Sequence, residues 1–247
     1  MKRITPGLFL ALLLAANPIP AEQHATSMPP NFAIQPVEQD AEWAVEWWRP
    51  RHEEKLEQAR EQDIDLLMLG DSITQGWEGP GAEVWKRYYE DRNAFNLGFG
   101  GDRTEHVLWR LQHGAVDGMN PRLVVLMIGT NNTGHRMDPA AYTAEGVAMI
   151  VGELRERLPD SRILLLAIFP RSVSPFNDMR ERNAEINALI SRLDDGDMIH
   201  YLDVNDIFLE ADGTLRAELM PDLLHPNAAG YAEWAEAVEP VISRLME

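Results

Sequence analysis

The chain alternates short, continuously apolar runs with longer stretches of helical periodicity. A run that is apolar at every position is typical of a strand buried on both faces, as in a parallel sheet. The strand candidates are Ile64–Leu69, Ala94–Leu97, Leu123–Ile128, Ile163–Phe169 and Met198–Val204. The helix candidates lie near residues 82–91, 104–113, 140–158, 178–193 and 228–245. This alternation predicts an α/β protein, a three-layer α/β/α sandwich around a mostly parallel five-stranded sheet of the flavodoxin-like kind.

The residues before the first strand fall into two parts. Residues 22–37 are rich in proline and aperiodic, and predict an extended lead-in. From Asp40 to Gln62 the pattern is helical, and Pro50 is expected to interrupt or kink that helix. Trp43 and Trp47 lie one turn apart, and we expect them to pin this segment onto the core, with stacking on a sugar as the alternative. Residues 38–247 are predicted to form a single domain.

The first 21 residues have the order of features of a secretory signal. Lys2 and Arg3 precede the apolar run Leu8–Ala16, and Ala21 is a suitable cleavage point. The run is too short to cross a bilayer comfortably, so stable membrane insertion is not expected. A buried first helix is the alternative. We expect residues 1–21 to be removed and the protein to be periplasmic or secreted.

Charge and composition exclude several classes of function. The formal net charge is −18, which disfavours nucleic acid and anionic membrane surfaces as partners. The chain has no cysteine, so thiol nucleophiles, disulfides and thiolate metal sites are excluded. The seven histidines show no paired ligand spacing, and most are expected to be structural or solvated (His106, His113, His135 and His200). No metal and no other cofactor is predicted.

A serine follows the first predicted strand, in Gly70-Asp71-Ser72. Sheets of this kind bind ligands outside the carboxyl ends of their strands, so residues that directly follow strands are site candidates. A serine at a strand-to-helix turn exposes its hydroxyl, and its amide can donate to a developing oxyanion. The alternative for Ser72 is a helix N-cap.

Two further loops follow strands. Gly98-Phe99-Gly100-Gly101 follows the second strand, and its glycines let backbone N–H groups approach a ligand, with a plain tight turn as the alternative. This string is a poor match to a dinucleotide-binding fingerprint. Asn131 and Asn132 follow the third strand, where an asparagine side-chain amide is a suitable oxyanion donor.

An acid and a histidine precede the last predicted helix. Asp222 and His225 are three residues apart, so the carboxylate can fix the imidazole tautomer and stabilise the imidazolium. A solvated surface pair is the alternative for these two residues. Together with Ser72, they supply a nucleophile, a base and an orienting acid at one predicted edge of the sheet.

The chain resembles the SGNH, or GDSL-type, hydrolases in all four of their sequence blocks. The resemblance is greatest to the catalytic subunits of the intracellular platelet-activating-factor acetylhydrolases and to related bacterial esterases. Its most specific stretches are Asn96–Leu111 and Gly129–Thr133. Ile73 replaces the usual leucine after the serine, and Asn132 replaces the common aspartate, but neither change removes a catalytic group.

The resemblance implies a serine esterase that needs no cofactor. Ser72 would be the nucleophile, His225 the base and Asp222 its orienting acid. The oxyanion hole would consist of the backbone N–H groups of Ser72 and Gly101 and the side-chain amide of Asn131. The residue types and their positions after strands indicate the roles of Ser72, His225, Asp222 and Asn131 independently of the resemblance. Only the resemblance selects Gly101 among the glycines of its loop.

The substrate is inferred from the residues that flank these groups. The positions that match Ile73, Thr130 and Leu224 border the acyl pocket of the resembling acetylhydrolases, and bulky side chains there leave room for acetyl but not for a long chain. Because export disfavours the lipid substrate of intracellular relatives, we expect an acetylated small molecule or carbohydrate. Since the resembling subunits dimerise, a homodimer is an alternative to a monomer.

Three other hypotheses are retained or set aside. A phospholipid, lysophospholipid or platelet-activating-factor-like acylhydrolase would share all the catalytic groups and differ in acyl length and alcohol. A non-catalytic carbohydrate-binding protein belongs to another class, but a binder does not require serine, histidine and aspartate together with oxyanion donors. An α/β-hydrolase is disfavoured because Thr74 stands where that nucleophile motif has glycine.

Overall fold

The computed structural model describes residues 29–247, of which Asn31–Glu247 form one compact unit. The predicted secretory signal (residues 1–21) and the first part of the lead-in lie outside the described residues. Among residues 29–247, no helix has both the length and the hydropathy needed to cross a bilayer.

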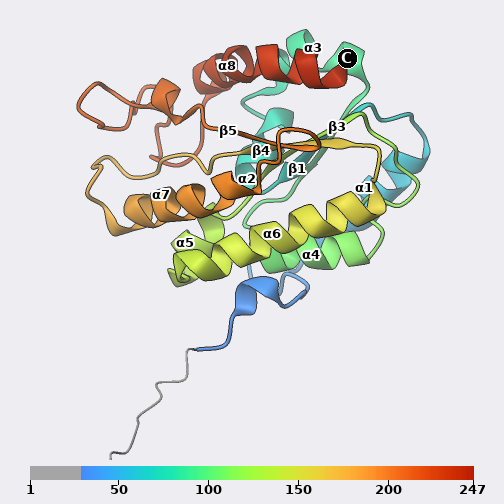
Figure 1. Cartoon of the computed structure of the whole chain (residues 1–247), viewed down its shortest axis with the longest axis horizontal. Helices are drawn as coiled ribbons and strands as arrows, with labels where there is room; N and C mark the ends of the chain where they lie inside the picture. The colour runs from blue at the N-terminus through green and yellow to red at the C-terminus, as the bar shows by residue number, and fades with distance from the viewer. Residues whose placement is uncertain (1–28) are drawn as a thin grey trace, which may run out of the picture. The chain divides into compact units, whose positions relative to one another are not determined.

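A five-stranded parallel sheet forms the centre of the unit (Figure 1). Its strands are β1 (Leu66–Gly70), β2 (Ala94–Gly98), β3 (Leu123–Met127), β4 (Arg162–Leu166) and β5 (Ile199–Leu202). Their spatial order is β2-β1-β3-β4-β5, the flavodoxin-like order. The predicted α/β fold with a five-stranded parallel sheet is confirmed, and every strand lies within the run that predicted it or within one residue of it. Strands β1 to β4 are largely buried, whereas β5, at the edge of the sheet, is only partly buried.

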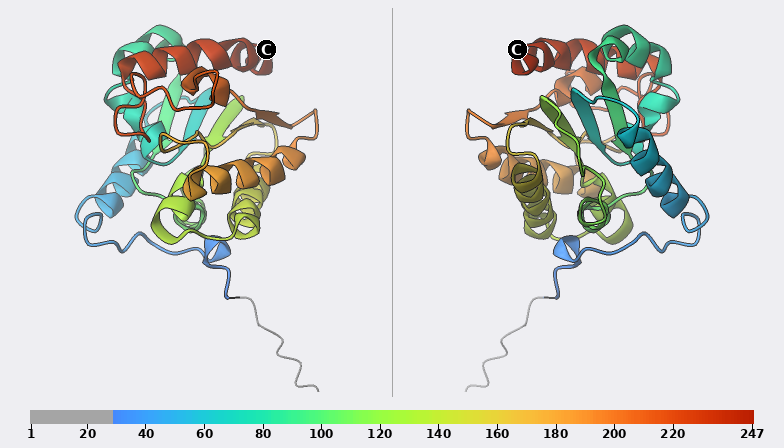
Figure 2. Two further views of the ribbon diagram at one scale, coloured as in Figure 1. Left: turned by 90° about the vertical axis from the view of Figure 1, so that its left-hand side faces the viewer. Right: turned by 90° about the vertical axis from the view of Figure 1, so that its right-hand side faces the viewer.

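Helices cover both faces of this sheet (Figures 1 and 2). The long helices are α1 (Trp48–Arg60), α4 (Thr104–Gln112), α6 (Ala140–Arg157), α7 (Asp178–Ile190) and α8 (Ala228–Met246). The short ones are α2 (Ser72–Gln75), α3 (Ala82–Tyr88) and α5 (Thr130–Arg136). Helices α3 and α8 lie on one face, and α4, α6 and α7 lie on the other.

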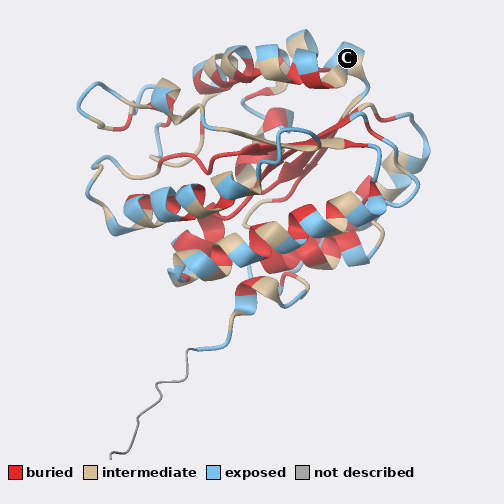
Figure 3. Cartoon of the chain, viewed as in Figure 1, coloured by how far each residue is buried: buried red, intermediate tan, exposed pale blue. Residues whose placement is uncertain are grey.

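Alternate residues of each strand point into two separate hydrophobic clusters. In β1, Leu67 and Leu69 pack with residues of α4, α6 and α7, whereas Leu66 and Met68 pack against α3 and α8. All five residues of β1 and of β3 are buried, which explains why the runs are continuously apolar (Figure 3). The sheet is therefore rigidly held, and its carboxyl edge is a stable platform for loops.

The structure differs from the predicted pattern before the first strand. Helix α1 begins at Trp48 rather than near Asp40, and Pro50 lies in its first turn, where a missing N–H costs no hydrogen bond. The expected kink at Pro50 is therefore wrong. Residues Phe32–Ile34 form a 3₁₀ turn instead of a purely extended lead-in, and the Ala33 carbonyl accepts a 2.8 Å hydrogen bond from Thr104 Oγ1.

Two short helices were not predicted from the pattern. Helices α2 and α5 have only 4 and 7 residues. Helix α5 is largely polar and buried through amide and hydroxyl groups, so it has no apolar periodicity to detect. Both helices follow strands directly, and they carry residues of the candidate site.

Candidate active site

The sheet topology brings three strand ends together. Strand β1 lies between β2 and β3, and Gly70 at its end is in register with Gly98 of β2 and with Met127 of β3. The residues that follow these strands, Ser72, Gly101 and Asn131, are therefore delivered to one edge of the sheet from three neighbouring strands.

Ser72 is the first residue of helix α2. Asp71 caps this helix, because its Oδ1 accepts a 3.0 Å hydrogen bond from the Ile73 amide. The other end of the turn is tied to α8 by Tyr231, whose hydroxyl donates to the Ile73 carbonyl at 2.7 Å. Ser72 is thus not the N-cap, and its hydroxyl remains available to another partner. The helix-cap alternative for Ser72 is wrong, because Asp71 occupies that position.

The partner of the Ser72 hydroxyl is His225, from the loop before α8. Ser72 Oγ lies 2.8 Å from His225 Nε2, and His225 Nδ1 lies 2.6 Å from Asp222 Oδ2. Asp222 Oδ1 also accepts from the backbone amides of Leu224 and His225, at 3.0 and 2.7 Å. The carboxylate therefore fixes both the ring and the backbone that carries it, and the ring presents Nε2 to the serine.

The loop that carries Asp222 and His225 has an unusual backbone conformation. Leu223 adopts a φ of 63°, in the left-handed region that bulky residues rarely occupy. Its carbonyl accepts a 3.0 Å hydrogen bond from the Ser172 amide, on the loop after β4. The loop is tight enough to fold one carboxylate back onto two amides and an imidazole.

Gly101 and Asn131 follow the two strands, β2 and β3, that lie on either side of β1. Gly101 has a φ of +72°, which favours glycine, and no acceptor within residues 29–247 is hydrogen-bonded to its amide. Asn131 is buried, and its Nδ2 donates a 2.9 Å hydrogen bond to the Asp102 carbonyl. An asparagine amide has two N–H groups, so this bond orients the side chain and leaves a second donor.

A buried ion pair braces the loop after β2, and sequence analysis missed it. Asp102 and Arg110 are both fully buried, with Arg110 Nη2 2.8 Å from Asp102 Oδ2. Trp48 Nε1 donates to Asp102 Oδ1 at 2.6 Å, and the Arg110 guanidinium lies 4.0 Å from the centre of the Phe99 ring. The spacing of Asp102 and Arg110, about two helical turns apart, was the one signal of this pair in the sequence. That spacing does not predict a buried pair, because charged residues are usually solvated.

The three residues predicted to border the acyl group adjoin the catalytic candidates. Ile73 and Thr130 are buried and Leu224 is partly buried. Thr130 is fixed by Arg171, whose Nη1 donates to its carbonyl at 2.8 Å and to its hydroxyl at 3.2 Å. Arg171, on the loop after β4, is a neighbour of the site that sequence analysis did not single out.

The two aspartates beside the catalytic candidates have opposite pKa shifts. Burial raises the pKa of Asp71 to about 7, against the hydrogen bond from the Ile73 amide. Burial also acts to raise the pKa of Asp222, but hydrogen bonds from the His225 backbone and imidazole hold it below its ordinary value. Asp222 is thus the carboxylate that stays ionised beside the histidine.

The Asp71 shift predicts a pH-dependent stability difference. Between about pH 4 and pH 7 the unfolded chain releases the Asp71 proton while the folded chain retains it, so rising pH lowers the free energy of unfolding. Urea unfolding of the wild type and of Asp71→Asn, which preserves the cap, measures this contribution. The stability of the wild type relative to the variant should fall across that range and level off above about pH 7. A pH-independent difference would contradict the shift.

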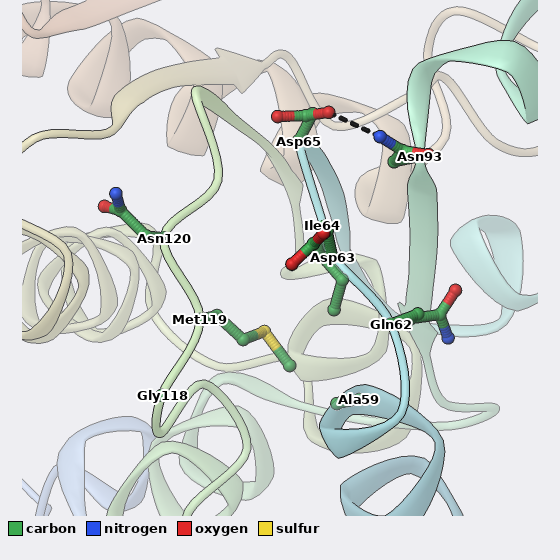
Figure 4. A pocket seen from close by; sticks show the side chains of 9 residues that line it. All are labelled: Ala59, Gln62, Asp63, Ile64, Asp65, Asn93, Gly118, Met119 and Asn120. Carbon is green, nitrogen blue, oxygen red and sulfur yellow. Dashed lines mark hydrogen bonds between the residues drawn. The ribbon is translucent and has the colours of Figure 1, made fainter.

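Among residues 29–247, one further polar hollow lacks the side chains of a catalytic site. This hollow, of about 390 Å³, lies at the opposite edge of the sheet, where Asp65 accepts a 2.6 Å hydrogen bond from Asn93 (Figure 4). Its lining contains neither serine nor histidine. Within the described chain, no cluster of three metal-ligating acids or histidines is found. Burial lowers the pKa of His106 to about 2, as suits a neutral structural histidine.

A parallel α/β sheet with a serine, a histidine and an aspartate in contact at its carboxyl edge defines the class of serine hydrolases. Residues 68–233 match the model of the GDSL-like Lipase/Acylhydrolase family, and the chain belongs to this family. It is therefore a carboxylic ester hydrolase, and the resemblance inferred from the sequence is confirmed.

Curated relatives and solved structures agree with this assignment. The chain is 33% identical over 200 residues to the platelet-activating factor acetylhydrolase IB subunit alpha1 of Homo sapiens, covering 81% of this chain and 84% of that protein. It is 32% identical over 201 residues to the alpha2 subunit of Rattus norvegicus, covering 81% and 85%. A GDSL-like lipase from Bacteroides thetaiotaomicron has the same fold, with a TM-score of 0.63, 17% identity and coverage of 79% and 97%. So does a carbohydrate acetylesterase from Sinorhizobium meliloti, with a TM-score of 0.58, 17% identity and coverage of 74% and 100%.

Proposed function

We propose that the protein hydrolyses short-chain esters, acetyl esters above all, through an acyl-enzyme on Ser72, and that its natural substrate is an acetylated carbohydrate. The observation that carries the mechanism is the hydrogen-bonded chain from Ser72 Oγ through His225 to Asp222, at 2.8 and 2.6 Å. These are the distances over which a base can take a proton and be oriented by a carboxylate.

The reaction proceeds in two halves. Ser72 Oγ attacks the ester carbonyl carbon while His225 Nε2 takes the hydroxyl proton, and Asp222 stabilises the imidazolium. The C–O bond to the alcohol then breaks, and His225 returns its proton to the leaving oxygen. Water, deprotonated by the same imidazole, attacks the acyl-enzyme and releases the acid. In both halves the oxyanion is bound by the amides of Ser72 and Gly101 and by Asn131 Nδ2.

Loss of one oxyanion donor should lower turnover by a large and measurable factor. Asn131→Ala removes a side-chain donor, and we expect kcat on p-nitrophenyl acetate to fall roughly 10²–10³-fold. Asn120→Ala, the same change at the opposite edge of the sheet, serves as the matched control and should retain activity. An Asn131→Ala enzyme that is folded and within threefold of wild-type kcat would remove Asn131 from the oxyanion hole.

The acetyl preference rests on the residues beside the catalytic groups. Ile73 and Thr130 are both buried, Tyr231 holds the Ile73 carbonyl, and Arg171 holds the Thr130 carbonyl and hydroxyl, so this wall has little freedom to move aside for a long acyl chain. The curated relatives are acetylhydrolases by name. A series of p-nitrophenyl esters tests this preference: kcat/KM should be highest for acetate and fall as the chain lengthens. A maximum at long chains would favour the alternative, a lipid acylhydrolase.

The carbohydrate preference rests on charge and on the predicted export. A net charge of −18 repels anionic lipid surfaces, and neutral acetylated sugars avoid that repulsion. Release of acetate from a panel of acetylated sugars, xylans and phospholipids tests it directly. Release from the phospholipids alone would overturn the carbohydrate assignment.

We further propose that the enzyme acts outside the cytoplasm, supported by the basic, apolar and small residues of the first 21 positions. Mass spectrometry of the protein recovered from periplasm or medium should find an N-terminus after Ala21. An uncleaved chain confined to the cytoplasm would contradict export.

A further inference from the structure

An exposed indole lies against the loop that follows β2. Trp43 is 55% exposed, on the turns before α1. Its Cη2, Cζ2 and Cζ3 atoms are the ones nearest to the place where a Cβ on Gly101 would stand, with Cη2 only 2.1 Å from that place. The six-membered ring of Trp43 therefore covers the outer side of Gly101, the residue whose amide faces the proposed oxyanion.

Two aromatic side chains hold this indole in place. The Trp47 ring lies 6.2 Å away, tilted by 32°, and its Nε1 donates to the Trp43 carbonyl at 3.1 Å. The His135 ring lies edge-on to the indole, at 6.4 Å and 73°. Since His135 belongs to the same helix, α5, as Asn131, the indole adjoins both Gly101 and the helix that carries Asn131.

Trp43 is not needed to attach its segment to the core. Trp48 performs that role, because it is fully buried and hydrogen-bonded to Asp102. The expectation that Trp43 and Trp47 both pin the segment is therefore correct only for Trp47, which packs against the core. An indole that leaves more than half of its surface in water forgoes most of its hydrophobic stabilisation. Its position beside the site points to a role in binding.

We propose that Trp43 is a stacking subsite for a pyranose ring in the alcohol part of the substrate, an inference that rests on the esterase function proposed above. The oxyanion and the alcohol oxygen are attached to the same tetrahedral carbon, so a ring on that oxygen is within reach of the surface around Gly101. A pyranose has an apolar C–H face and a rim of hydroxyls, which matches an exposed indole with a flat apolar face and an N–H at its edge.

The charges around Trp43 favour a neutral sugar, because its segment is acidic and the neighbouring Arg103, 3.4 Å from His135, is paired with Glu105 at 2.6 Å. Asp40, Glu42 and Glu46 are exposed on the same short segment, and they repel phosphate-bearing groups. A choline group would be attracted by these acids, but quaternary ammonium ions are bound in cages of several rings. Here Trp47 and His135 already pack against the indole, so it offers a platform rather than a cage.

A second exposed ring offers a rival path for the alcohol. Phe176 is 83% exposed and lines a hollow of about 500 Å³ with His135 of α5 and with Met137, which follows that helix. Trp43 and Phe176 both neighbour α5. Comparing Trp43→Ala with Phe176→Ala therefore shows which of the two side chains the alcohol contacts.

The first test measures kcat/KM on methyl tri-O-acetyl-β-xylopyranoside and on ethyl acetate, which has no ring. In Trp43→Ala the ratio of the two values should fall about tenfold, the scale of one lost aromatic contact. Trp43→Phe should restore most of the ratio. Val45→Ala, a nearby exposed apolar control, should not change it. An unchanged ratio in Trp43→Ala, or a fall in Phe176→Ala instead, would overturn the proposal.

A binding measurement separates this proposal from the esterase function. Calorimetry with the same xyloside on Ser72→Ala and on Ser72→Ala/Trp43→Ala requires no turnover, and the second protein should bind about tenfold more weakly. Equal binding would overturn the stacking subsite and leave the esterase untouched. Trp43-dependent binding in a protein whose wild type does not hydrolyse the xyloside would support the subsite and count against the carbohydrate ester. Trp43-dependent binding of phosphocholine in place of the xyloside would overturn the sugar assignment.

Discussion

Ser72→Ala is expected to reduce kcat on p-nitrophenyl acetate by about six orders of magnitude. The residual rate should be that of the uncatalysed reaction, raised only by the oxyanion donors that remain. The reason is specific to the geometry: His225 Nε2 lies 2.8 Å from the Ser72 hydroxyl, so the variant keeps a base and an orienting acid but has no nucleophile to activate. Initial rates at saturating ester measure the effect.

This loss should occur without unfolding. The serine side chain makes no hydrogen bond that supports the core, since α2 is capped by Asp71 and anchored through the Ile73 carbonyl. The thermal midpoint of Ser72→Ala should therefore stay close to that of the wild type. Ser191→Ala, at the end of α7, is the matched control and should keep full activity. Substantial turnover by folded Ser72→Ala would eliminate the assigned nucleophile.

Arg110→Met is expected to have the largest effect on stability, lowering the free energy of unfolding by about 3–5 kcal/mol. The substitution leaves the Asp102 carboxylate fully buried with Trp48 as its remaining side-chain hydrogen-bond donor. Removing one partner of a buried ion pair exposes the other to the whole cost of burying a charge. Urea unfolding measures the change.

Two companion variants identify the cause of that destabilisation. Arg49→Met removes an arginine from exposed pairs with Glu38 and Glu53, and should lower the free energy of unfolding far less than Arg110→Met does. Asp102→Asn/Arg110→Met removes both charges, and the double variant should be more stable than the sum of the single effects implies. Strict additivity, or a cost for Arg110→Met below that of Arg49→Met, would contradict the proposed role of the pair.

The fold was predictable because the sheet is buried on both sides. Strands such as β1 and β3 must be apolar at every position, so the chain shows them as uninterrupted runs, and the flavodoxin-like order follows from their alternation with helices. The start of α1 was missed because its charged residues continue the helical pattern of the preceding turns. The packing of Phe32–Ile34 against the core depends on residues far away in sequence.

The catalytic candidates were predictable in kind but not in geometry. Ser72, Asp222 and His225 all adjoin predicted strands or helices, and the sheet topology then accounts for their contact. The left-handed Leu223 that closes the histidine loop has no sequence signal, because leucine is a poor residue for that conformation. The brace formed by Asp102 and Arg110 was hidden because its two charges look like surface residues until the core closes over them.

Trp43 shows why the interpretation of a tryptophan needs the structure. From the sequence, Trp43 and Trp47 share one expectation, that they pin the segment onto the core, with stacking on a sugar as the alternative. In the fold, Trp48 is buried, Trp47 is half-buried and Trp43 remains exposed against Gly101. The difference arises because the chain turns before α1, so these three side chains leave the backbone toward different surroundings.

The most direct test of the central claim is covalent labelling with a fluorophosphonate, followed by peptide mapping. A serine activated by His225 should form a phosphonyl adduct on the peptide that contains Ser72, at one label per chain, in step with the loss of esterase activity. His225→Ala should label far more slowly. An active enzyme that takes up no label, or that is inactivated by label on another residue, would contradict the assignment of Ser72 as the nucleophile.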